Sequence, residues 1–417
     1  MPFQRSSARS FWLAATVILL LASSFGARAA GLIIYRVYLP ARDYQEITLP
    51  TLTYEYSDGR PSITAPPCED GLRSKLLLAL AGKRCSWGKV VNPAVSLVNI
   101  AYPDLNAYYW VTRFDADTAM RIKISGVFPD ARYMSINLYD DSLSPYSVNG
   151  VPSALADFRI EPDPRNVNPW QQISGAGGHF TLYAVNDPHP GDINTLPLPP
   201  STIAGSGFHP PKPCTTDCPP LNQFQRPSDI SGLLPNADNA YVAAITRPLP
   251  GQVLVVRGKA PLIPPGTFPN HPLPWPNSAQ VRYWSLCNNL YLPPYPVVIN
   301  RHHNQPPESG CVADYQVSLD DDGYYTIVVG AARAKPEQLP PDVSWLPNSA
   351  LLPNVRHLLI LRNMLAEEFP NSIQNVPADD QPASAQTVMG DYYPRIYPCA
   401  QSTFEQQGWQ ACVNTPE

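Results

Sequence analysis

The chain has 417 residues, of which 44% are hydrophobic and 15% charged, so it is globular and long enough for two domains with cores of their own. Its net charge of −5 makes it a poor partner for nucleic acid and for anionic lipid surfaces. Because proline interrupts helices, 51 prolines exclude a fold built from long helices.

Residues 1–29 have the pattern of a signal peptide. Arg5 and Arg9 precede an apolar run over 11–25, and Ala27 to Ala29 supply the small-residue pattern that a signal peptidase recognises. The run is shorter than the roughly 20 residues of a membrane-spanning helix. We therefore favour cleavage near Ala29 over a retained anchor or a core helix. The mature protein is expected to be secreted or periplasmic, with no stable membrane span.

Residues 30–95 are interpreted as an N-terminal extension that leads into the first domain. The apolar stretch 33–39 is typical of a strand, and 72–81 predicts a short helix that ends at Gly82.

Residues 96–186 and 236–350 contain the same motifs in the same order, which indicates two copies of one folding unit. In the first copy, apolar and polar residues alternate with the period of a half-buried strand in 120–125 and 133–139, and 252–257 is the second copy's equivalent of the first of these strands. We therefore predict two related antiparallel β-sandwich domains. The matched segments are Asn106-Ala107-Tyr108 with Asn239-Ala240-Tyr241, Arg132-Tyr133-Met134-Ser135 with Arg282-Tyr283-Trp284-Ser285, and Ala156-Asp157-Phe158 with Ala313-Asp314-Tyr315.

Two further segments complete the organisation. Residues 187–235 are rich in proline, glycine, serine and threonine, which predicts a linker without regular helix. In 351–417, the segment 355–369 predicts an amphipathic helix ended by Pro370, and the rest predicts a disulfide-linked cap.

The number of cysteines is even, and the expected compartment is oxidising, so disulfides are the default interpretation. Short-range pairing is expected. A metal half-site at Cys214 and Cys218 is the alternative, but no second cysteine or histidine pair has zinc spacing. The expected pairs are Cys68 with Cys85, Cys214 with Cys218, Cys287 with Cys311, and Cys399 with Cys412.

The second copy resembles an uncharacterised bacterial family, the domain of unknown function numbered twelve-fourteen. The residues that carry the resemblance are Gly258, Arg282 to Ser285, Asp322 to Thr326, and Ser344 to Pro347. The first copy keeps the Arg-Tyr-x-Ser element but lacks the Trp-Leu-Pro segment. The resemblance implies an exported β-sandwich of jelly-roll type, and it implies no activity.

The duplicated polar residues are the first candidates for a site. A structural interpretation pairs each arginine with the aspartate of its own copy, on neighbouring strands. The alternative is one ligand site per copy, in which arginine binds a carboxylate or a sugar hydroxyl and neighbouring aromatic rings stack on the sugar. The candidate ligand-binding residues are Arg132, Asp157, Arg282, Asp314, Trp284, Tyr133 and Tyr283.

Candidates for catalysis are weaker. His302 and His303 lie in a polar loop, but a metal site needs a third ligand, and neither His271 nor Asp314 can be placed beside them from sequence. Asp140 and the run Asp320 to Asp322 are typical of turns, although the run could bind calcium. We predict no metal and no cofactor. The catalytic candidates are His302, His303, Asp140 and Asp314.

The sequence thus favours an exported binding protein, with carbohydrate as the expected ligand at the cleft between the copies. An extracellular hydrolase or lyase acting on carbohydrate, and a structural assembly module, are the alternatives. No nucleic-acid partner is expected, and nothing in the sequence sets the oligomeric state.

Overall fold

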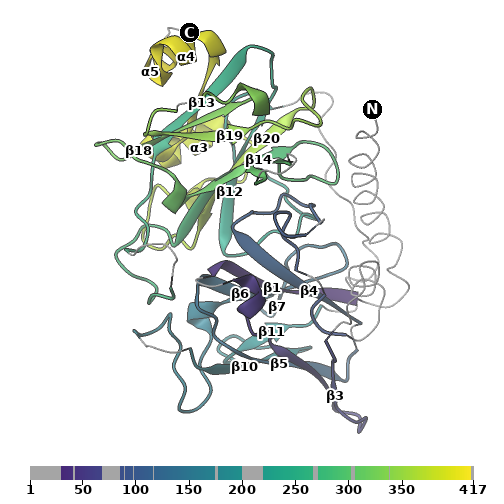
Figure 1. The fold of residues 1–417 in the computed structure, drawn as a ribbon. Coiled ribbons are helices and arrows are strands. Elements are labelled where there is room, and N and C mark those ends of the chain that lie inside the picture. Colours follow the sequence, from purple (N-terminus) through teal and green to yellow (C-terminus); the bar gives the residue numbers. More distant parts are fainter. Residues whose placement is uncertain are drawn as a thin grey trace.

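A computed structural model describes residues 30–40, 43–67, 85–88, 90–96, 98–115, 117–173, 177–199, 219–265, 271–301, 306–337 and 339–414. The fold is mainly β and consists of two sandwiches side by side (Figure 1). The first is built from residues up to Pro197 and the second from Asn239 onward. The predicted pair of related β-sandwich domains is therefore confirmed.

The first sandwich has one sheet in the order β4-β1-β6-β9 and a second in the order β11-β10-β5-β2-β3. Apolar side chains of both sheets, such as Ile33, Leu52 and Ile122, fill the space between them. The strands are β1 (Ala30–Pro40), β2 (Thr51–Tyr56), β3 (Ile63–Thr64), β4 (Ala107–Asp115), β5 (Met120–Val127), β6 (Ala131–Tyr139), β9 (Ala154–Ala156), β10 (His179–Val185) and β11 (Thr195–Pro197), with a small hairpin of β7 (Ser147–Val148) and β8 (Val151–Pro152).

The second sandwich has sheets in the orders β12-β20-β14-β17 and β19-β18-β13-β21. Its core contains Trp284, Tyr325 and Leu359. The strands are β12 (Asn239–Thr246), β13 (Gln252–Lys259), β14 (Tyr283–Leu290), β17 (Cys311–Ala313), β18 (Tyr324–Gly330), β19 (Val343–Pro347), β20 (His357–Met364) and β21 (Arg395–Ala400), with a small hairpin of β15 (Ile299–Asn300) and β16 (Glu308–Ser309).

The two sandwiches share one strand arrangement but differ in chain order. β1 lies between β4 and β6, just as β20 lies between β12 and β14, and all four pairings are antiparallel. Likewise, β2 pairs with β5, and β21 pairs with β13. The strands that begin the first sandwich therefore correspond to those that end the second, which makes the copies circular permutations of each other.

This correspondence changes the predicted boundaries. The segment 30–95 is more than an extension, because it supplies the central strand β1 of the first sandwich. The strand register also shifts the predicted alignment of the two copies by one residue. Tyr38 of β1 corresponds to Met364 of β20, and these residues lie opposite Ala107 and Asn239, respectively. Ala107 therefore corresponds to Asn239, whereas the sequence alignment matched it with Ala240.

The helix predicted over 355–369 is wrong, because this segment contains strand β20. All eight residues of β20 are buried. A central strand that is covered on both faces is buried on both, so its sequence lacks the alternation that marks a half-buried strand. The helix predicted over 72–81 lies outside the described residues.

The C-terminal cap follows the prediction. It contains α3 (Pro382–Met389), α4 (Gln401–Gln407) and α5 (Trp409–Val413), and the Cys399–Cys412 disulfide joins β21 to α5. The Cys287–Cys311 disulfide, also predicted, joins facing residues of β14 and β17. Cys85 is disulfide-bonded, whereas Cys68, Cys214, Cys218 and the predicted signal peptide lie outside the described residues. No helix in the described part of the chain is long and apolar enough to cross a membrane.

Candidate functional site

Two buried ion pairs connect the sandwiches. Arg132 of the first pairs with Asp314 of the second, and Arg282 of the second pairs with Asp157 of the first. Each aspartate follows a short edge strand, β9 or β17, and opens a 3-10 turn. Each arginine was expected to pair with the aspartate of its own copy, but each pairs with the aspartate of the other copy. Such crossed pairing follows from an approximate two-fold relation between the sandwiches, which no pattern within one copy reveals.

Backbone N–H groups also donate hydrogen bonds to both carboxylates. Asp157 accepts a hydrogen bond from the backbone N–H of Met134 at 2.8 Å, and Asp314 accepts one from that of Trp284 at 3.3 Å. Burial raises the pKa of Asp157 to about 6, although Arg282 and the backbone donors oppose the shift. Burial raises the pKa of Asp314 as well. The paired arginine and the backbone donors favour the charged form of each carboxylate, and the two pairs join the two sandwiches.

The other predicted ligand-binding residues are also buried in this region. Tyr133 and Tyr283 are fully buried, and their hydroxyls donate to Asp238 and Asp104, respectively. Trp284 packs against Tyr325 inside the second core, with ring centroids 5.1 Å apart.

The predicted catalytic residues do not come together in the described residues. Asp140 accepts hydrogen bonds from Ser142 and lies in a turn. Asp314 is held in its ion pair, and His302 and His303 lie outside the described residues. His271, weighed as a third metal ligand, is exposed and contacts Asp130 at 2.6 Å.

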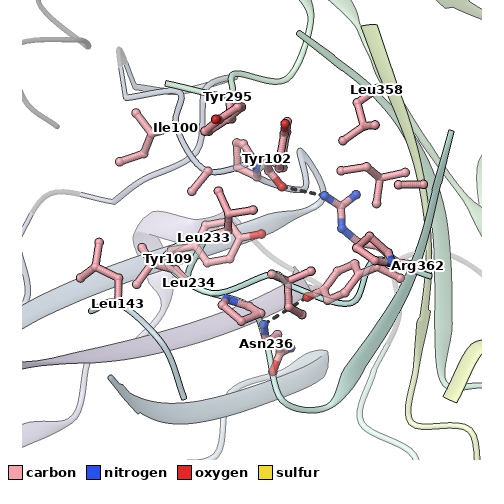
Figure 2. Close-up of a pocket in the computed structure, with 18 of the residues that line it drawn as sticks. Ile100, Tyr102, Tyr109, Leu143, Leu233, Leu234, Asn236, Tyr295, Leu358 and Arg362 are labelled. Atoms are coloured by element: carbon pink, nitrogen blue, oxygen red, sulfur yellow. Dashed lines mark hydrogen bonds between the residues drawn. The ribbon is translucent and has the colours of Figure 1, made fainter. Parts of the chain in front are cut away.

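A cavity of about 310 Å³ lies between the sandwiches (Figure 2). Its wall combines β1 and β4 of the first sandwich with β12 and β20 of the second, together with loops from both. Most of the lining side chains are aliphatic or tyrosine; they include Leu32, Ile34, Ile100, Tyr109, Leu143, Leu233, Tyr241, Ala243, Tyr295, Leu358 and Ile360.

Two equivalent arginines lie in the cavity wall. Arg36 of β1 and Arg362 of β20 each face a tyrosine across the sheet, Tyr109 or Tyr241. Each donates to a backbone carbonyl of the other sandwich's loop. Arg36 Nη2 lies 2.9 Å from the oxygen of Leu234. Figure 2 shows the equivalent bond of Arg362, whose Nη2 lies 2.6 Å from the oxygen of Tyr102. The wall of the cavity therefore repeats the crossed pattern of the ion pairs.

Those loops have matching backbones. Tyr102 and Leu234 adopt left-handed conformations, with φ values of 51° and 52°. Their backbone N–H groups donate across the interface, to Tyr295 at 2.8 Å and to Leu143 at 3.3 Å. Each arginine thus donates to a loop of the other sandwich, and that loop is in turn hydrogen-bonded to the arginine's own sandwich.

Sequence reasoning missed both arginines. The signal exists, because the stretch 33–39 aligns with 359–365 and places Arg36 opposite Arg362. These stretches lie at opposite ends of the chain, however, and a search for tandem copies does not compare them.

No family model matches the chain, and no curated protein matches it significantly. Among solved structures, it is similar to an uncharacterised protein from Burkholderia cenocepacia, with 11% identity and a TM-score of 0.42 over 80% of this chain and 87% of that one. It is also similar to the VPA0106 protein from Vibrio parahaemolyticus, with 13% identity and a TM-score of 0.23 over 89% of both chains.

Proposed function

We propose that this is an exported binding protein that holds a small, mainly apolar ligand between its two sandwiches. The cavity carries the proposal, because its volume of about 310 Å³ and its aliphatic and aromatic wall match those of small-molecule sites. The Cys287–Cys311 and Cys399–Cys412 disulfides and the predicted signal peptide support an exported protein.

The wall suits an apolar ligand better than the carbohydrate that the sequence favours. A sugar ring buries many hydroxyls, and each needs a partner, since an unpaired buried polar group is costly. Here the arginines already donate to Leu234 and Tyr102, and the Asn236 side chain donates to the Tyr133 hydroxyl at 3.2 Å. Carbohydrate remains the alternative that a competition experiment tests.

The proposal is tested with Nile red, an uncharged dye whose fluorescence increases in apolar surroundings. The wild-type protein should give a saturable increase. Ala243→Trp, which fills the cavity from β12, should abolish it. Ala331→Trp, at an exposed position outside the cavity, should bind like wild type.

Non-saturable fluorescence, or equal saturable binding by both variants, contradicts the proposal. Displacement of the dye by a neutral oligosaccharide would favour carbohydrate as the ligand instead. Circular dichroism of each variant confirms that it is folded.

A further inference from the structure

The cavity wall contains a buried cation whose charge is incompletely balanced. Arg36 is 2% exposed, and its guanidinium donates through Nη2 to Leu234 and to the hydroxyl of Tyr139. Its Nη1 atom has no hydrogen-bond partner, and no carboxylate of the described residues lies within ion-pair distance. A buried charge without a close counterion is costly, so this position attracts an anion.

Its counterpart Arg362 differs in one respect. The carboxylate of Asp104 lies 3.9 Å from Arg362 Nη1. The matching loop position in the second copy is Asn236. Each of these side chains accepts a hydrogen bond from the backbone N–H two residues later, that of Asn106 for Asp104 and that of Asp238 for Asn236. A neutral amide thus stands in the second copy where the first copy has the carboxylate of Asp104.

Other groups near Arg36 do not replace the missing charge. Burial raises the pKa of Tyr109 and of Tyr139 to about 12, so both hydroxyls are neutral at pH 7. Asp238 forms no ion pair with Arg36 and interacts with it only electrostatically, because its carboxylate is hydrogen-bonded to the hydroxyl of Tyr133.

Two acidic residues, Asp229 and Asp380, also line the cavity. Asp229 is exposed, and Asp380 borders a second surface pocket, which places it at the outer end of the cavity. Asp380 also accepts hydrogen bonds from Ser228. Solvent screens these charges, whereas the charge of Arg36 lies in an apolar, water-poor wall.

We infer that the ligand is an amphipathic anion, with an acidic group such as a carboxylate against Arg36 and an apolar body in the rest of the cavity. This inference rests on the proposed binding function. A carboxylate matches a guanidinium in geometry and charge, and the aliphatic wall excludes the water that would weaken their attraction.

The test compares decanoate with decanol, which have the same apolar chain and differ in charge, as competitors of Nile red. Decanoate should bind wild type about 10- to 100-fold more tightly, as expected for a charge-assisted hydrogen bond. Arg36→Met should remove this preference, so that decanoate and decanol bind it about equally, while Arg36→Lys should retain part of it. Arg257→Met is the matched control, because Arg257 pairs with Asp320 outside the cavity.

Equal binding of decanoate and decanol by wild type would overturn the inference and leave the proposed function standing. So would a preference for decanoate that persists in Arg36→Met. Failure of the dye and both competitors to bind would instead overturn the proposed function, and the inference with it. The wild-type comparison needs no variant, so it decides the question even if Arg36→Met does not fold.

Discussion

Removing one member of a crossed ion pair should destabilise the protein far more than removing the charge of both. In Arg282→Met, the fully buried Asp157 keeps only its backbone donors, at 2.8 Å from Met134 and 2.6 Å from Phe158. An uncompensated buried carboxylate costs about 3–5 kcal/mol. Asp157→Asn in the same chain removes the charge and keeps an acceptor oxygen, so the double variant should recover roughly half of the loss or more.

The assay is a double-mutant cycle. Urea unfolding at pH 7.5, followed by tryptophan fluorescence with the disulfides intact, gives the stability of each variant. Arg282 with Asp157 should show a coupling energy of roughly 2–3 kcal/mol, at the upper end of the range for contacting residues. The control cycle combines Arg282 with Asp314, the partner expected from sequence, and should show a much smaller value.

The result that would refute the reasoning is equal coupling in the two cycles, or stronger coupling of Arg282 with Asp314. Either outcome would mean that the sandwiches are not joined by crossed pairs. Arg257→Met serves as a reference, because its ion pair with Asp320 is partly exposed and lies outside the interface. That variant should lose no more than about 1 kcal/mol, as is typical of exposed ion pairs.

Two further predictions concern stability. Burial lowers the pKa of His357 to about 4. The neutral imidazole therefore contributes fully to the free energy of unfolding above pH 6.5, and this contribution of about 3 kcal/mol is lost as the pH falls toward 4. His357→Gln should flatten this dependence in urea unfolding measured across that range, and an unchanged slope would contradict the assignment. Replacing both Cys287 and Cys311 by alanine should cost about 2–4 kcal/mol and lower the melting temperature, because the bridge spans 24 residues; an unchanged calorimetric melting temperature would argue against it.

Much of the architecture could be predicted from local patterns. Alternation identified half-buried strands such as β5, and short spacing identified the Cys287–Cys311 and Cys399–Cys412 bridges. The duplicated Arg-Tyr-x-Ser element marked equivalent strands, β6 and β14, in both sandwiches. These signals are local, so one sequence is sufficient to detect them.

The rest depends on contacts between distant segments. The partner of Arg132 is 182 residues away, and either aspartate satisfies the same local pattern. β20 lacks alternation because both of its faces are buried. The cavity forms only when loops from both copies meet, so its wall has no signature in either copy alone.

Circular permutation explains why the two arginines of the cavity wall escaped notice and why they are not equivalent. Approximate two-fold symmetry places Arg36 and Arg362 in matching positions, each held by the opposite loop. If that symmetry were complete, both would have the same counterion. The change from Asp104 to Asn236 breaks it at one position and leaves one arginine partly unbalanced. The two halves of a duplicated fold thereby place two differently paired arginines in the wall of one cavity.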